Sequence, residues 1–334
     1  MRKLTLNIFF IIFITKIFSQ DIHFSQYYFS PLSLNPANTG NYKGPFRVFG
    51  NYRSQWRDIS SAYNTFSAGG DFNFYPNGQQ VSGGLIFIND KSGGNLQVMK
   101  IMPSAAIHKK ISGYDVSFGI QPGFVVKSID FYSHSFPNQF NIGTGTFDNS
   151  LPNIENSVVQ KFSYLDLNSG FNISKKMGNF EPELSVAFFH LNKPKESFLS
   201  NTNKLKVRQS YNVNLNYYLN DKINLKGYTM YGLTTKVSDW VTGFNVEYIL
   251  LKNNFFTNSV FGGFMWRDGI NRNADAGILT AGINYSNYTI GFSYDVTMSK
   301  LKTAVDNKGA FEIAIIYKAK NTRLNKIEIP CERY

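Results

Sequence analysis

Hydrophobic and polar residues alternate along much of the chain, beginning near residue 46. In "LKVRQSYNVNLNYYLN" one parity holds Val207, Tyr211, Val213, Leu215, Tyr217 and Leu219, and the other holds Lys206, Arg208, Ser210, Asn212, Asn214 and Asn216. The stretches "YTIGFSYDVTMS", "YDVSFGIQPGFVVK" and "GAFEIAIIYK" repeat this pattern. A period of two over ten or more residues predicts long β-strands with one apolar and one polar face.

About fourteen such runs can be counted. They begin near Phe46, Tyr63, Val81, Val98, Tyr114, Tyr164, Glu183, Val207, Ile223, Trp240, Phe255, Ala274, Tyr288 and Gly309. The runs near Val81 and Val98 are the weakest, because apolar residues occur there on both parities. Short turns such as "YPNG", "KISGYD", "LND" and "YSN" alternate with longer connections such as "NDKSGGN" and "NKPKESFLSNTNK". Short turns rich in Gly, Asn and Asp are typical of β-hairpins.

The chain start is typical of a secretory signal peptide, residues 1–19. Arg2 and Lys3 precede an apolar run that ends at Phe18, and Ser19 is a small residue at a candidate cleavage position. The alternative is a transmembrane anchor, but the run is shorter than the ~20 residues of a spanning helix and contains Lys16. We therefore expect export, and no cysteine follows that could carry a lipid.

Composition narrows the class of exported protein. Apolar residues make up 43% of the chain and aromatic residues 16%, whereas charged residues are only 17%, below the ~25% of soluble domains. No second long apolar segment is present. This combination predicts a transmembrane antiparallel outer-membrane β-barrel of about 14 strands, with the short turns periplasmic and the long loops extracellular. The alternative is a large secreted β-sandwich or propeller.

A barrel of this size encloses a lumen, which the polar parity would line. The expected lumen residues are Arg47, Asn51, Arg53, Asp71, Asn73, Asp166, Asn168, Asn172, Asn245 and Glu247. Residues 128–160 form one much longer connection, polar and rich in Asn with scattered Phe. A loop of this length either folds into the pore or projects as a partner-binding surface.

Charge and chemistry exclude several functions. The formal charge is +12, or +9 once Arg2, Lys3 and Lys16 leave with the leader, which favours lipid phosphates or an acidic partner. The four histidines have no metal-ligand spacing, and no nucleophile elbow, phosphate loop or nucleic-acid motif is present. Ser104 and His108 share a parity, but we interpret them as ordinary lumen residues. We expect no enzyme activity, no cofactor, no metal and no nucleic-acid partner, and the single Cys331 permits no internal disulfide.

Several short motifs occur in order: "HFSQYYFSPLSLNPANTG", "RVFGNYRSQWRDI", "GFMWRDGINRNADAG", "SYDVTMSKL", "GAFEIAIIY" and "IPCERY". This series resembles the PorP/SprF family of outer-membrane proteins of the type IX secretion system in Bacteroidetes, over nearly the whole mature chain. The N-terminal motif is the most specific part. The ending "CERY" departs from the "CPRF"-like endings common in the family.

The resemblance implies a barrel that works with a secretion machine. Family members help export or retain large surface proteins, including gliding adhesins, by recognising a type B C-terminal domain of the cargo. Other members connect the translocon or its periplasmic ring to the envelope. We therefore expect as partners a secreted surface protein, other secretion components and outer-membrane lipid. The alternative function is a passive porin-like channel for small solutes.

The aromatic, irregular stretch before the first strand calls for its own interpretation. We expect residues 20–45 to form an ordered plug or periplasmic collar, 46–320 the barrel and 321–334 a C-terminal tail. In this hypothesis Tyr27, Tyr28 and Phe29 pack on the barrel rim, and Asn35 and Pro36 form a turn that aims the chain into the first strand. The alternative is a solvated leader.

Two Trp–Arg motifs are further candidates. In "NYRSQWRDI", Arg53 and Arg57 flank Trp56, either as a contact for an acidic cargo segment or as a Trp at the lipid headgroups. Trp266 and Arg267, beside Asp275, are a second candidate rim site with the same two interpretations, a cargo contact or a Trp at the lipid headgroups. The predicted partner-binding residues are His23, Phe24, Gln26, Tyr27, Tyr28, Asn35, Pro36, Arg53, Trp56, Arg57, Trp266, Arg267 and Asp275.

Overall fold

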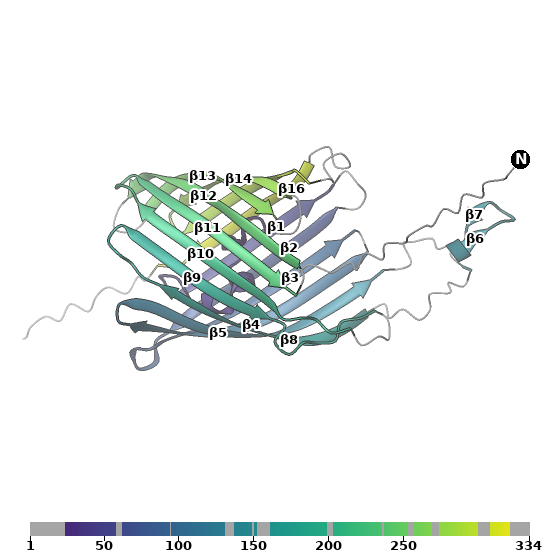
Figure 1. The fold of residues 1–334 in the computed structure, drawn as a ribbon, viewed down its shortest axis with the longest axis horizontal. Coiled ribbons are helices and arrows are strands. Elements are labelled where there is room, and N and C mark those ends of the chain that lie inside the picture. The colour runs from purple at the N-terminus through teal and green to yellow at the C-terminus, as the bar shows by residue number, and fades with distance from the viewer. Residues whose placement is uncertain are drawn as a thin grey trace, which may run out of the picture.

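The fold is a closed barrel of antiparallel strands, seen in a computed structural model (Figure 1). The structure describes residues 24–57, 62–93, 95–130, 137–148, 150–151, 161–198, 203–235, 237–252, 257–268, 274–299 and 308–320. Within these residues fourteen strands pair with their sequence neighbours, and the first pairs with the last. The closing register runs from Arg47 opposite Lys318 to Gln55 opposite Ala310, so the barrel leaves no open edge.

The barrel strands are 10 to 16 residues long, enough to cross a bilayer when tilted. They are β1 (Phe46–Gln55), β2 (Tyr63–Phe74), β3 (Gln80–Ser92), β4 (Leu96–Ile111), β5 (Tyr114–Ile129), β8 (Lys161–Ser174), β9 (Phe180–Phe189), β10 (Arg208–Tyr218), β11 (Ile223–Thr234), β12 (Val237–Lys252), β13 (Thr257–Asp268), β14 (Ala276–Tyr285), β15 (Tyr288–Thr297) and β16 (Lys308–Lys318). Each starts within three residues of its predicted position. The predicted fold class is therefore confirmed.

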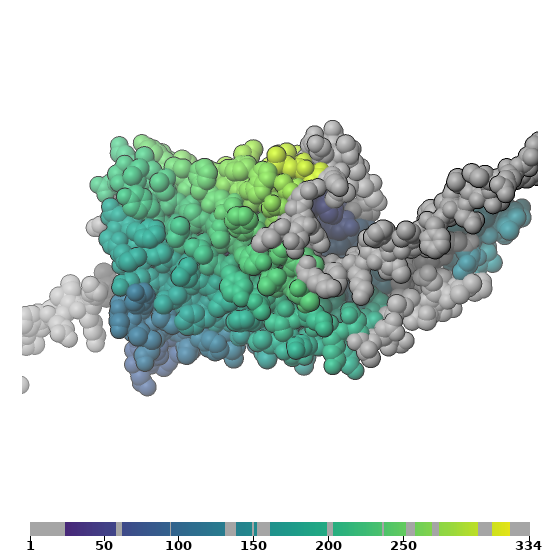
Figure 2. Space-filling view, in the orientation of Figure 1, coloured from purple at the N-terminus to yellow at the C-terminus, as the bar shows by residue number. Residues whose placement is uncertain are grey.

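The two parities face different surroundings, as the alternation predicts. In β15, Phe292 and Tyr294 point outward and are exposed on the wall, whereas Ser293 and Asp295 point into the lumen and are buried. Figure 2 shows one side of this wall, a continuous surface over the green strands. Phe244 of β12 and Phe264 of β13 are likewise exposed. The outward side chains are those that lipid would solvate.

Aromatic side chains gather where several strands begin or end. Phe46 and Tyr288 both pack against Tyr317, with ring centroids 5.8 and 4.9 Å apart. These residues lie at the start of β1, the start of β15 and the end of β16. Such a cluster is typical of the aromatic girdles of membrane barrels.

The connections differ at the two ends of the barrel. One end, called here the short-turn end, holds the connections at 75–79, which include η3 (Pro76–Gly78), and at 112–113, 175–179, 219–222 and 286–287. The opposite, long-loop end includes the connections at 130–160 and 190–207. The expected long connection "NDKSGGN" is wrong, because β3 continues through Ser92 and leaves a connection of three residues, 93–95. Which end faces the periplasm stays a prediction.

The long loop carries a small structure of its own. Within its described residues, η4 (Pro137–Gln139) precedes a two-stranded sheet of β6 (Phe140–Asn141) and β7 (Thr146–Phe147). In Figure 1 this sheet lies beyond the long-loop end, away from the barrel. The described part of the loop therefore projects and does not fill the pore. No helix among the described residues is both long and apolar enough to span a membrane.

Candidate functional site: the occupied lumen

The lumen is occupied by the chain's own N-terminal segment, residues 24–44, which we call the lumen segment. It contains η1 (Tyr27–Phe29), α1 (Pro31–Leu34) and η2 (Pro36–Asn38), the purple coils inside the barrel in Figure 1. Ser25 contacts strand ends at the long-loop end, and Gly40 contacts Asp71 near the short-turn end. The lumen segment therefore runs the length of the lumen, antiparallel to β1.

Local sequence explains its irregular path. Pro31 and Pro36 each begin a short helix, because proline fits the first helical position but cannot continue a preceding helix. Asn35 ends the first helix and caps the second, its side-chain oxygen accepting from the Ala37 amide at 2.8 Å. The predicted Asn35–Pro36 turn thus exists, between two helices inside the lumen and ten residues before β1.

The long-loop end of the lumen segment sits in a buried charged cluster. The Ser25 and Gln26 amides donate to the two oxygens of Glu312 at 2.8 and 3.0 Å. The Ser25 hydroxyl donates to Asp295 at 2.8 Å and accepts from Arg53. Arg53 also pairs with Asp295 at 2.9 Å and with Glu312 at 3.4 Å. Serine and backbone groups of the lumen segment thus bridge charges on β1, β15 and β16.

Arg267 belongs to the same cluster. Its guanidinium pairs with Asp295 at 3.0 Å and with Asp275 at 2.6 Å, and it donates to the Ser25 hydroxyl at 3.2 Å. Two motifs more than 200 residues apart in sequence, around Arg53 and Arg267, therefore converge on one carboxylate.

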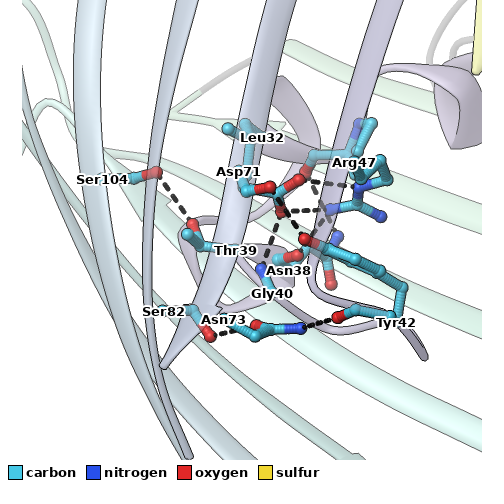
Figure 3. Close-up of polar contacts among 12 residues, drawn as sticks. Leu32, Asn38, Thr39, Gly40, Tyr42, Arg47, Asp71, Asn73, Ser82 and Ser104 are labelled. Atoms are coloured by element: carbon cyan, nitrogen blue, oxygen red, sulfur yellow. Dashed lines mark hydrogen bonds and ion pairs between the residues drawn. The ribbon is translucent and has the colours of Figure 1, made fainter. Parts of the chain in front are cut away.

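The short-turn end is held by a second ion pair (Figure 3). Arg47 donates from Nε and Nη2 to the two oxygens of Asp71 at 3.0 and 2.6 Å, and from Nη2 to the Asn38 carbonyl at 2.9 Å. Asp71 also accepts from the Gly40 amide at 2.7 Å. Gly40 has φ +73°, a conformation that favours glycine, and a Cβ there would lie 1.9 Å from the Ser82 hydroxyl.

Thr39 anchors the same stretch to β4. Its hydroxyl lies 2.8 Å from that of Ser104, and its carbonyl accepts from His108 Nε2 at 2.8 Å. Ser104 and His108, which share a parity in the sequence, both contact the lumen segment rather than each other. Among the described residues no group of three or more His, Cys, Asp or Glu could hold a metal.

In the middle of the lumen the wall approaches the lumen segment closely. The Asn35 side-chain amide donates to the Phe171 and Val186 carbonyls, both at 3.2 Å. A Cβ on Gly170 would lie 1.8 Å from the Asn35 side-chain oxygen, and one on Gly119 would lie 2.3 Å from the Pro36 carbonyl. Only glycine leaves room for these contacts.

Aromatic stacking holds the other side of η1. Tyr28 stacks on Tyr228 with ring centroids 4.5 Å apart, and its hydroxyl accepts from Asn245 at 3.1 Å. Burial raises the pKa of the Tyr27 and Tyr28 phenols well above the ordinary value, and the neighbouring Tyr228 adds to the effect. Tyr228 lies midway along β11, so these aromatics pack on the lumen wall at mid-height rather than on a rim.

The apolar side chains of the lumen segment form the core of the molecule. Phe29 and Leu32 pack with Phe49, Ile86 and Met102 from the wall, and Tyr27 and Leu34 form a second cluster with β11–β14. Burying Phe24, Phe29, Leu32 and Leu34 at about 1.5–3 kcal/mol each contributes roughly 6–12 kcal/mol as an upper estimate. Spontaneous loss of the lumen segment from the barrel is therefore strongly disfavoured.

The predicted site residues lie in several different places in the structure. Phe24, Gln26, Tyr27, Tyr28, Asn35 and Pro36 all lie in the lumen, mostly fully buried, and His23 lies outside the described residues. Arg53 and Arg267 point into the lumen, whereas Trp266 takes the opposite parity and Trp56 and Arg57 follow the end of β1. Trp266 and Arg267, neighbours on β13, therefore face opposite sides of the wall. A partner-binding role for either Trp–Arg motif stays a prediction.

Trp56 and Arg57 remain at the long-loop end. The Trp56 ring packs edge-on against Tyr63 at 4.9 Å, and Arg57, which is exposed, donates to the Ser54 hydroxyl at 2.9 Å. The sequence reasoning missed the binding roles of Asp295 and Glu312. In each case the available signal was an acidic residue on the inward-facing parity of its strand.

The geometry defines a class: a membrane-spanning β-barrel whose lumen is filled by the chain's own N-terminal segment. Comparison with known proteins agrees with the barrel. The Ralstonia pickettii toluene transporter TbuX superposes with a TM-score of 0.53 at 10% identity, covering 87% of this chain and 93% of that one. The CymD monoaromatic hydrocarbon channel superposes with a TM-score of 0.52 at 9% identity, with the same coverage. At these identities the likeness shows the fold alone.

Sequence comparison gives the family. Residues 17–317 match the family described as type IX secretion system membrane protein PorP/SprF. None of the curated proteins matches the chain. The chain therefore belongs to the PorP/SprF family and is an outer-membrane β-barrel component of the type IX secretion system, as its motifs indicate.

Proposed function

We propose that this barrel binds a secreted surface protein, such as a gliding adhesin, through the partner's type B C-terminal domain, for export or surface retention. The observation that carries the proposal is the occupied lumen. Lumen-facing residues that would be wet in an open pore, among them Asn51, Asn168 and Asn172, are only 1–2% exposed. A barrel filled in this way is suited to holding a partner rather than to free diffusion of solutes.

The long-loop end supplies exposed groups for such a partner. In the turn between β6 and β7, Ile142 is 90% exposed, and Phe140 and Phe147 on the two strands are also exposed. Large apolar groups at the tip of a projecting loop are typical of protein contact sites. Trp56 and Arg57, residue types favoured at binding hot spots, lie at the same end of the barrel. We place the first contact with the partner on these residues.

Affinity purification of the tagged full-length chain from its own cells tests this proposal. We expect a large surface protein to co-purify and to be lost when its C-terminal domain is deleted. Ile142→Asp with Phe147→Asp should lower recovery of the partner at least ten-fold. Lys110→Ala, at the short-turn end, is the matched control and should leave recovery unchanged. A folded barrel that retains no surface protein, or one indifferent to the C-terminal domain, would contradict the proposal.

A further inference from the structure

The wall of the lumen binds the main chain of the lumen segment. Among the described residues, wall side chains hydrogen-bond to eight of its backbone groups. These are the amides of Ser25, Gln26 and Gly40 and the carbonyls of Leu32, Asn38, Thr39, Gly40 and Gly44. Backbone amides and carbonyls are present in every peptide. Such recognition depends on the path of the bound chain more than on its side chains.

The arginines that bind the lumen segment form their ion pairs with residues of the wall. Residues 24–42 contain no Asp, Glu, Lys or Arg. The three arginines described above that donate hydrogen bonds to these residues are also paired with wall carboxylates: Arg47 with Asp71, and Arg53 and Arg267 with Asp295. Arg47 and Asp71 are direct partners in the β1–β2 register. Departure of the lumen segment would therefore break no ion pair and leave the wall's ion pairs in place.

Some buried polar atoms of the lumen segment have no hydrogen-bond partner on the described wall. Both polar atoms of the Gln26 side-chain amide and the Tyr27 hydroxyl are buried without a hydrogen-bond partner among the described residues. Buried polar groups are ordinarily paired, so another occupant could pair better at these positions. Because its apolar side chains hold the lumen segment in place, replacement by another occupant is favoured over simple opening.

We propose that the lumen is a peptide-binding channel, and that an uncharged segment of the bound partner, bearing aromatic, Asn and Ser side chains, takes the place of residues 24–42. This inference rests on the proposed function, since the partner is the protein that the barrel binds. The displaced residues stay joined to β1 through Lys43 and Gly44. They leave toward the short-turn end, where Lys43 is already exposed and Gly44 has φ +138°.

A synthetic peptide of residues 24–42 is the probe. It is labelled and added to the full-length chain carrying Leu32→Asp, which places a charge in the apolar cluster of the resident segment and weakens its hold without changing the wall. We expect this peptide to bind at least ten-fold more tightly than the same peptide with Ser25→Lys and Leu32→Lys. Equal binding of both peptides, or binding of neither to a barrel that keeps its folded heat-modifiable mobility, overturns the inference.

A disulfide lock shows where the peptide binds. Thr39→Cys and Ser104→Cys, with Cys331→Ser, replace two hydroxyls that lie 2.8 Å apart, within the reach of a disulfide. In the Leu32→Asp chain, oxidation should lower peptide binding at least ten-fold, and reduction should restore it. Unchanged binding after oxidation would place the peptide outside the lumen and overturn the channel. Capture of the surface protein in the co-purification reports separately on the proposed function.

Discussion

Replacing Asp71 by Asn tests the buried ion pair at the short-turn end. The Asp71 side chain is fully buried, Arg47 contacts both of its oxygens, and the Gly40 amide donates to one of them. The amide in Asp71→Asn has the same shape but no charge, and so leaves a buried guanidinium without its carboxylate. Breaking such a pair costs about 3–5 kcal/mol, or roughly 10²- to 10⁴-fold in the folded-to-unfolded ratio.

Urea unfolding in lipid vesicles, followed by tryptophan fluorescence, measures this cost as a shift in midpoint. The matched control is Asp115→Asn, which breaks an exposed pair with Lys110 at 3.6 Å and should cost at most about 1 kcal/mol. If Asp71→Asn is no more destabilising than Asp115→Asn, Asp71 and Arg47 are not the buried pair described here, and the seat of the lumen segment at this end is wrong.

Three further predictions concern the lumen segment. A Cβ on Gly291 would lie 2.5 Å from the Phe29 ring, so the side chain added in Gly291→Val should displace the lumen segment and expose it to cleavage by chymotrypsin. The control is Gly262→Val, which faces outward. A Cβ on Gly262 would lie 3.6 Å from its nearest neighbour, so this variant should not increase cleavage. Asn35→Ala loses a helix cap and two bonds to strand carbonyls and should lower the free energy of unfolding by about 2–4 kcal/mol in urea titration. Since burial raises the pKa of Tyr28, the contribution of Tyr28 to stability is full below pH ~10 and falls as the pH rises above that value. At pH 11 the folded barrel should therefore show fewer tyrosinates by 295 nm absorbance than the unfolded chain. Equal numbers in the two states would contradict the burial.

Much of the barrel could be predicted because a period of two needs only local sequence. The two weakest predicted runs, near Val81 and Val98, show where that reasoning stops. Ile86, Ile88 and Met102 in these runs point into the lumen, where they pack in one cluster with Phe29 and Leu32. The alternation predicts polar side chains facing the lumen. At these three positions the inward side chains are apolar instead, because they contact the apolar side chains of the lumen segment.

The site was less predictable, because its contacts join residues far apart in the chain. Ser25 and Asp295 are 270 positions apart, and no local pattern relates them. The aromatic character of the N-terminal stretch did indicate an ordered segment. Its place in the lumen depends on barrel closure, which brings β1, β13, β15 and β16 around the same two residues, Ser25 and Gln26.

Conductance across a planar lipid bilayer tests the occupied lumen most directly. The purified full-length chain should give no steady open current, and the chain lacking residues 24–40 should give a large one, provided that its heat-modifiable mobility shows a folded barrel. A steady, wide pore in the full-length chain, equal to that of the shortened one, would show that these residues do not fill the lumen.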